Sequence, residues 1–245
     1  KLAFVLGAVD NPNARRINKK PMPTIGGLAI FVAFNIGEFV LLRKDFPTHE
    51  LFSVLLASSV IILTGLIDDI LELKPRQKMF GIFVASLVVY FLAGIKVREL
   101  SLPFLGHIQL GWWSFPLTIF WILALTNAVN LIDGLDGLAT GVTLISLVTM
   151  GIVGFFFLKS WQHYVPIMCI MLAACLLGFL PYNFHPAKIF LGDTGALYIG
   201  FMISVLSLKG LKNVTFVSLL VPILILGVPI TDTVYAMIRR KLNKK

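Results

Sequence analysis

The stretch NAVNLIDGLDGLATG, residues 127–141, places two asparagines and two Asp-Gly pairs between apolar segments that are each about long enough to cross a membrane. Polar side chains at such a boundary cost free energy unless a ligand or a metal ion uses them. Ordinary explanations exist for Asp133 and Asp136, since one can cap the helix that begins near Leu138 and the other can occupy a turn. Two Asp-Gly pairs exceed what a helix cap needs, so the stretch predicts a ligand or metal contact.

The composition is that of a membrane protein, with 58% hydrophobic residues, 13% charged residues and a mean hydropathy of +0.91. We therefore predict an all-α integral membrane protein, a polytopic helical bundle with about eight spans in this chain. The apolar runs lie at 25–42, 51–67, 79–95, 113–129, 138–158, 164–181, 194–208 and 216–236. The run 194–208 is the shortest and gives the weakest prediction. The segment 96–111 alternates partly around a Pro-Phe-Leu-Gly turn, which predicts a small hairpin.

Residues 1–245 are interpreted as a single membrane domain. The chain opens on a short apolar stub and stops at RRKLNKK, so we expect it to be truncated at both ends and to have more spans at full length. Cys169 and Cys175 lie six residues apart in one apolar run and so on different helix faces. We expect them to be packing residues without a disulfide.

Basic residues are distributed unevenly between the two sides of the predicted bundle. If the loops alternate, one side holds 13 lysines and arginines and the other holds 7; the first comprises 10–24, 68–78, 130–137, 182–193 and 237–245. The positive-inside rule makes the first side cytoplasmic. The same alternation brings most of the acids to that side, among them Asp68, Asp133 and Asp193. Topology thus explains the net charge of +9, and we expect no nucleic-acid partner.

Asp68 and Asp69 end the predicted span 51–67. The carboxyl end of a helix already carries partial negative charge, so two adjacent carboxylates there are disfavoured. A solvated helix end explains one acid more easily than two. A divalent cation or a lysine would offset the cost, and Lys78, at the start of the next span, can fold back toward the pair.

The segment around Asp193 reads Gly-Asp-Thr-Gly and opens the run 194–208. Asp193 or Thr194 can simply cap that helix. A helix N-terminus also presents free N–H groups to an anion, and a neighbouring carboxylate can hold Mg²⁺ on that anion. Asn183 ends the preceding span, and Lys20 precedes the PMPTIGG segment, where it either anchors the chain by its charge or contacts a phosphate.

Acids and lysines gathered at one membrane face suit a particular chemistry. Mg²⁺ and lysine next to lipid favour phosphoryl transfer from a soluble diphosphate to a membrane-bound phosphate. No Ser-His-Asp set, Walker loop or dinucleotide motif is present. An ion-coupled transporter is an alternative, but it predicts acids near the midplane of the spans. A scaffold or lipid-binding module is a third alternative, and it would not need the convergence of acids.

Four motifs, in order along almost the whole chain, resemble the polyprenyl-phosphate N-acetylhexosamine-1-phosphate transferases, which include the phospho-N-acetylmuramoyl-pentapeptide transferase. They are PMPTIGG at 21–27, GLIDD at 65–69, NAVNLIDGLDGLATG at 127–141 and PYNFHPAKIFLGDTGA at 181–196. The resemblance implies a cytoplasmic active site in the bacterial inner membrane. It implies transfer of a sugar 1-phosphate from a UDP-N-acetylhexosamine to undecaprenyl phosphate, with release of UMP and a requirement for Mg²⁺, with Mn²⁺ as an alternative.

The resemblance also implies roles for individual residues. The metal ligands would be Asp193 and Asp68. The catalytic acids would be Asp68, Asp69, Asp133 and Asp136. The substrate contacts would be Lys20, Lys78, Asn127, Asn130 and Asn183. NFHPAKIFLGDTG resembles the N-acetylglucosamine branch. Glu72 stands where the muramoyl branch has a lysine, and that branch is the alternative. The family's histidine-containing segment after the last basic loop has no counterpart here. A direct or a covalent phospho-aspartate mechanism, and a homodimer, are left open.

Overall fold

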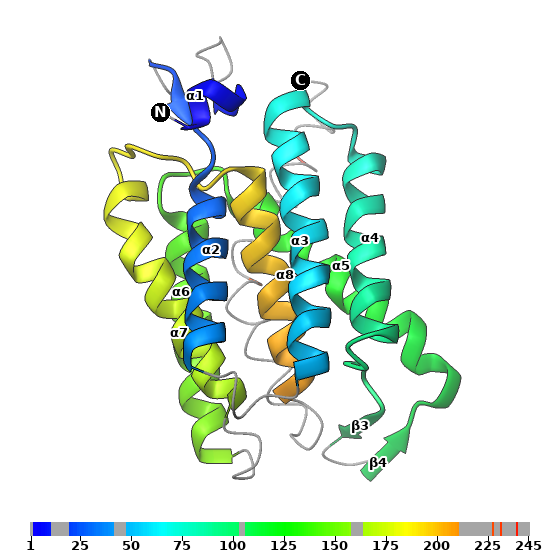
Figure 1. Ribbon diagram of the computed structural model, residues 1–245. Helices are drawn as coiled ribbons and strands as arrows, with labels where there is room; N and C mark the ends of the chain where they lie inside the picture. Colours follow the sequence, from blue (N-terminus) through cyan, green and yellow to red (C-terminus); the bar gives the residue numbers. More distant parts are fainter. Residues whose placement is uncertain are drawn as a thin grey trace.

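The computed structural model describes residues 2–10, 20–41, 48–102, 106–157 and 164–210, and the single positions 227, 231 and 239. Its long helices lie side by side in one bundle (Figure 1). They are α2 (Gly26–Leu41), α3 (Thr48–Leu71), α4 (Pro75–Phe91), α5 (Ser114–Ile132), α6 (Leu138–Phe157), α7 (Tyr164–Asn183) and α8 (Gly192–Gly210). Each matches one predicted span to within a few residues, so the helical bundle is confirmed. Apart from the single positions 227 and 231, the predicted span 216–236 lies outside the described residues.

The described helices identify a membrane protein. Four segments are long and apolar enough to cross a membrane: Thr48–Leu71, Gly111–Ile132, Leu138–Phe156 and Tyr164–Asn183. The helix α2 is apolar but has only 16 residues. The helices α4 and α8 are less apolar, because α4 carries Arg76 and Lys78 in its first turn and α8 carries Asp193 in its first turn and Lys209 in its last.

Short elements close the two ends of the bundle. At one end, α1 (Leu2–Leu6) leads into the antiparallel pair β1 (Val9–Asp10) and β2 (Met22–Pro23). At the other end, β3 (Glu99–Leu102) pairs antiparallel with β4 (Gly106–Gln109), which confirms the hairpin predicted within 96–111 (Figure 1). The 3-10 helix η1 (Gly111–Trp113) follows the hairpin, and its exposed Trp112 and Trp113 are typical of a membrane interface.

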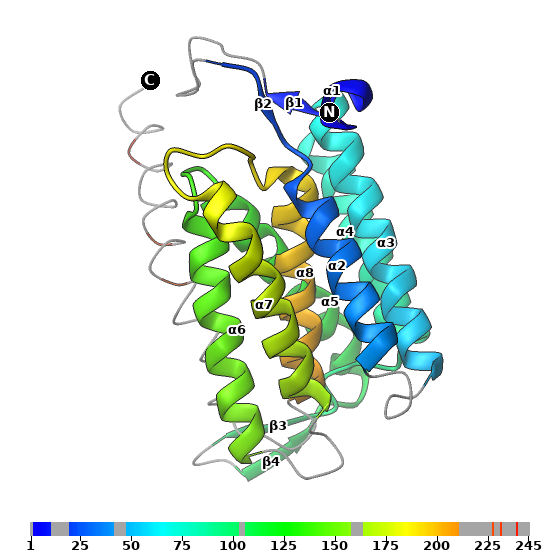
Figure 2. The ribbon, with the colours of Figure 1, turned by 60° about the vertical axis from the view of Figure 1, so that its left-hand side comes forward.

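The helix that the sequence predicts most weakly, α8, is the centre of the bundle. Every residue from 194 to 209 is buried. The helix packs against α2, α3, α5, α6 and α7, and Figure 2 shows it between them. A helix surrounded by protein needs no continuous apolar surface, which explains why it tolerates buried Ser204, Ser207 and Lys209. Ser207 accepts a hydrogen bond of 3.0 Å from the Trp121 indole of α5.

Glycines allow two helices to touch the first turn of α8. A Cβ atom on Gly27 of α2 would lie 2.1 Å from the Cα atom of Gly195, and one on Gly65 of α3 would lie 2.4 Å from the Cα atom of Thr194. Such distances are possible only where backbone packs directly on backbone. The position of the first turn of α8 is therefore fixed from two sides.

The far end of α8 carries a buried ion pair. Lys209 pairs with Glu50 of α3, and its ammonium lies 4.8 Å from the centre of the Tyr164 ring of α7. Glu38 of α2, also buried, faces the same charge. Lys209 belongs to the last turn of α8, where its charge also complements the helix dipole. Cys169 is buried and Cys175 half-buried, and both are free thiols as predicted.

Replacing Gly27 with alanine is expected to lower the stability of the detergent-purified protein by about 1–3 kcal/mol, because the new methyl group would push α2 away from α8. Gly178→Ala is the matched control, since no atom lies within 4 Å of a Cβ at that helical position. The measurement is the melting temperature of both variants beside the unmodified protein. Equal losses in both variants, or no loss for Gly27→Ala, would contradict the packing described.

Candidate active site

Helix ends that are distant in sequence meet at one end of the bundle. The carboxyl ends of α3, α5 and α7 and the amino ends of α2, α4, α6 and α8 all lie there, because consecutive helices run in opposite directions (Figure 1). Most of the acids and amides that the sequence analysis selected belong to these ends. The topology therefore brings them to one face, as the alternation of spans predicted.

A lysine joins two carboxylates at the centre of this end. The Lys78 ammonium of α4 donates to Asp193 Oδ1 of α8 at 2.7 Å and pairs with Asp68 Oδ2 of α3. Asn130 of α5 also donates its amide to Asp193 Oδ1. Asp68 is almost fully buried, and its Oδ1 accepts the Leu73 N–H at 2.8 Å. Four helices thus contribute one side chain each to a compact group of two negative charges, one positive charge and one amide.

Asp69 has a different role from its neighbour. Its carboxylate accepts the N–H groups of Asp193 and Thr194, at 2.9 and 3.0 Å, and the Thr194 hydroxyl. It therefore acts as the N-cap of α8, although it belongs to α3. The interpretation of Asp193 or Thr194 as the cap of its own helix is not what the structure shows, because the Asp193 carboxylate faces Lys78 instead. Nothing local in the sequence marks Asp69 as the acceptor, since the two partners are 124 and 125 residues apart.

Asp133 follows the last residue of α5 and lies beside the other acids. Its carboxylate has no hydrogen-bond partner among the described residues, and burial raises its pKa to about 7. The negative charges of Asp193, Asp69 and Asp136 contribute to this rise, after burial. A half-buried carboxyl group whose pKa lies close to 7 is suited to bind a cation or to exchange a proton.

Asp136 and Asn183 organise the loop between α7 and α8 in the structure. Asp136 Oδ2 accepts from the His185 ring at 3.0 Å and from the Ala187 N–H at 3.1 Å. The buried Asn183 donates to the Ile189 carbonyl at 3.1 Å and accepts from the Thr140 hydroxyl of α6 at 2.7 Å. These contacts with protein groups hold the loop between α7 and α8 against α6 and the segment before it. The catalytic role of Asp136 and the substrate contact of Asn183 stay predictions.

Asn127 and Lys20 lie at the edges of the site. Asn127, three residues before Asn130 on α5, donates to the Leu123 carbonyl at 2.7 Å and lies 3.1 Å from the Met79 sulfur. Lys20 is exposed and precedes β2, which lies at the end of the bundle where α2 begins (Figure 2). The hydrogen bonds of Asn127 join it to α5 and α4 and not to the group around Lys78. Their roles as substrate contacts also stay predictions.

The charged group can be compared with the needs of a magnesium ion. Among the described residues, no set of three His, Cys, Asp or Glu side chains forms a preformed metal cage. Mg²⁺ rarely uses such a cage, because it keeps several waters and is commonly held by one or two carboxylates together with substrate phosphates. Asp68 and Asp193 already converge on one positive charge, the Lys78 ammonium. Their donor oxygens therefore fit a Mg²⁺ ion that binds together with a diphosphate.

The raised pKa of Asp133 predicts a pH effect on stability. A carboxyl with a pKa of about 7 in the folded protein and an ordinary value in the unfolded chain contributes stability that is complete below about pH 4. This contribution is lost as the pH rises toward 7. Melting temperatures of the unmodified protein and of Asp133→Asn, measured from pH 4 to 8, should converge at low pH, with the variant becoming relatively more stable above pH 7. A constant difference across this range would contradict the assignment.

The sequence of this chain is similar to those of known proteins. The family model described as glycosyl transferase family 4 matches residues 51–211. A probable undecaprenyl-phosphate N-acetylglucosaminyl 1-phosphate transferase of Bacillus subtilis is 44% identical over 247 residues, which is 100% of this chain and 67% of the relative. A phospho-N-acetylmuramoyl-pentapeptide-transferase of Clostridium botulinum is 35% identical over 240 residues, 94% of this chain and 70% of the relative.

A decaprenyl-phosphate N-acetylglucosaminephosphotransferase of Mycolicibacterium smegmatis is 33% identical over 266 residues, 98% of this chain and 65% of the relative. The family match covers more than half of the chain, including Asp68, Lys78, Asn130 and Asp193. The chain belongs to glycosyl transferase family 4.

Proposed function

We propose that this protein transfers N-acetylhexosamine 1-phosphate, most favourably N-acetylglucosamine 1-phosphate, from its UDP-sugar to undecaprenyl phosphate and releases UMP. The observation that carries the proposal is the junction of Asp68, Lys78, Asn130 and Asp193 at one membrane end of the bundle. A water-soluble diphosphate and a lipid phosphate can meet only at such a boundary. The names of the relatives from Bacillus and Mycolicibacterium support this choice of sugar.

In the proposed reaction, an oxygen of the lipid phosphate attacks the sugar-proximal phosphorus of the UDP-sugar. A new P–O bond forms to that oxygen, while the bond from the same phosphorus to the bridging oxygen breaks, and UMP leaves with the electron pair. The second pKa of a phosphate monoester is about 6, so much of the acceptor is already a dianion at neutral pH. Asp68 would take the remaining proton where one is present. Positioning and charge neutralisation then supply most of the acceleration.

Asp68 is better suited than Asp69 to face the substrate. Both oxygens of Asp69 are occupied by α8, whereas Asp68 Oδ2 pairs with the Lys78 ammonium, a cation that can also bind a phosphate. Lys78 is suited to bind a phosphate, and Asn130 holds Asp193 in place. When Mg²⁺ is bound, by Asp193 and Asp68, it would supply charge neutralisation on the diphosphate. Mn²⁺ prefers similar oxygen ligands and is a substitute.

A covalent route, in which an aspartate carries the phosphoryl group, is the mechanistic variant. Incubation of the protein with the UDP-sugar in the absence of a lipid acceptor separates the two routes. Stoichiometric release of UMP would support the covalent route, and its absence would support direct transfer.

Two further parts of the proposal concern location and specificity. The excess of basic residues on the side of the acids supports a cytoplasmic active site in a bacterial inner membrane. Transfer of a muramoyl-pentapeptide phosphate is the alternative function, favoured by the relative from Clostridium but at lower identity. Trials with several UDP-sugars decide between the two. A homodimer is a further proposal, which the mass of the detergent-solubilised protein would test.

The transporter alternative has less support. The described acids near Lys78 gather at one end of the bundle, and the buried charges at the other end are neutralised by the Lys209–Glu50 pair. A pathway for ions would need ionisable groups between these two ends. The buried stretch of α8 from 196 to 208 contains no Asp, Glu, Lys, Arg or His residue.

Substitutions in the charged group should abolish UMP release from labelled UDP-N-acetylglucosamine and polyprenyl phosphate. We expect Asp193→Ala and Lys78→Met each to lower the rate at least about 100-fold, because each removes an electrostatic contact to the reacting diphosphate. Arg76→Gln, an exposed cation in the first turn of the same helix as Lys78, is the control and should keep near-normal activity.

Melting temperatures of the three proteins establish that they are folded. Near-normal turnover of folded Asp193→Ala would show that the metal and diphosphate assignment is wrong.

A further inference from the structure

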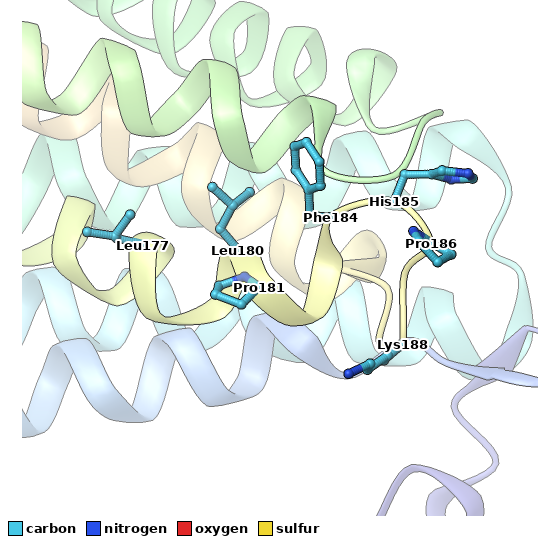
Figure 3. A pocket seen from close by; sticks show the side chains of 7 residues that line it. All are labelled: Leu177, Leu180, Pro181, Phe184, His185, Pro186 and Lys188. Atoms are coloured by element: carbon cyan, nitrogen blue, oxygen red, sulfur yellow. The ribbon is translucent and has the colours of Figure 1, made fainter.

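An apolar groove with a basic mouth lies on the outer side of α7. It has a volume of about 520 Å³ and is lined by Leu177, Leu180, Pro181, Phe184, His185, Pro186 and Lys188 (Figure 3). Leu177 and Phe184 are 59% and 63% exposed, as are other large apolar side chains on the outside of this membrane bundle, so the groove has an apolar wall. Lys188 is exposed at the end of the groove where the loop begins to return toward α8.

The groove borders the candidate active site where its His185 contacts Asp136, but it lies away from Asp68 and Lys78. The helix α7 packs on α6, α2 and α8, while α3 and α4, which carry Asp68 and Lys78, lie on the far side of α8 (Figure 1). The helix α7 is also one of the segments that meet the length and hydropathy of a membrane span. Its outward side therefore faces lipid, and an acyl chain is the natural occupant of the apolar part of the groove.

The basic mouth is built on a fixed backbone. The Lys188 N–H donates to the Tyr182 carbonyl at 2.8 Å, and the preceding Ala187 N–H donates to Asp136. The Lys188 ammonium, by contrast, has no hydrogen-bond or ion-pair partner among the described residues, and no acid lines the groove. A positioned, unpaired cation above an apolar wall at a membrane boundary is complementary to a phosphate on an acyl chain.

We propose that this groove binds one anionic phospholipid, with an acyl chain along Leu177, Leu180 and Phe184 and the phosphate headgroup on Lys188. The proposal does not depend on the proposed function. It assigns the lipid a structural consequence, because the loop beneath it is tied to the segment before α6 through Asp136 and to α2 through the bond from the Gly26 N–H to the Phe190 carbonyl, at 3.2 Å. A bound lipid would therefore hold together three elements that border the candidate site.

The test is the melting temperature of the purified protein in a neutral detergent, titrated with phosphatidylglycerol, with phosphatidylcholine or with inorganic phosphate. Phosphatidylglycerol should raise the melting temperature in a saturable manner, and the other two should not. Lys188→Gln should weaken the apparent affinity for phosphatidylglycerol about fivefold, as expected for one basic residue at a charged lipid surface. Lys188→Arg should retain it.

Arg76→Gln serves as the matched control, because Arg76 is also an exposed cation at this end of the bundle but lies on α4, outside the groove. It should bind phosphatidylglycerol as the unmodified protein does. Leu177→Asn should weaken binding by altering the apolar wall.

The Lys188 side chain supports no described contact, so Lys188→Gln should melt at the normal temperature without lipid. Equal affinity of Lys188→Gln and the unmodified protein would overturn the proposal. Equal effects of phosphatidylcholine, or of inorganic phosphate alone, would overturn it as well.

Discussion

The contact between the carboxyl end of α3 and the first turn of α8 is the constraint on which the rest of this structure depends. Asp69 accepts the N–H groups that begin α8, and Gly65, one turn earlier on α3, lets the two backbones touch. The free N–H groups of a buried helix start must find acceptors, because no water is available to them. Asp69 meets this need and at the same time fixes the direction in which α8 leaves the site.

The chemistry follows from this arrangement. Once the first turn of α8 is fixed, Asp193 lies beside Asp68, which is adjacent in sequence to the capping residue. Two carboxylates held this close repel each other, and Lys78 neutralises part of their charge. The side chains of Lys78 and Asp193 are partly exposed, so ligands can reach this ion pair. A phosphate could then replace a carboxylate at Lys78, or a cation could replace Lys78 at the carboxylates. The two adjacent aspartates therefore have different roles, since Asp69 caps α8 and Asp68 pairs with Lys78.

Much of this could be predicted from the sequence, for identifiable reasons. Hydropathy located seven described helices, because spanning a membrane requires about 20 apolar residues in a row. Alternation of the spans then brought Asp68, Lys78, Asn130 and Asp193 to the same end. The identity of the central helix was not predictable, since an apolar run does not tell whether it faces lipid or protein. The cap between Asp69 and Thr194 and the bond between Asp136 and His185 join distant residues, and no local pattern specifies such pairs.

The most direct measurement of the central contact is a double-mutant cycle between Asp69→Ala and Thr194→Val, read from the stability of the detergent-purified protein. If Asp69 holds the first turn of α8, Asp69→Ala alone destabilises the protein, and its bond to the Thr194 hydroxyl couples the two effects by at least about 0.5 kcal/mol. Strictly additive losses would contradict the hydroxyl contact, and a stable Asp69→Ala protein would mean that α8 is held by something else and would contradict the account.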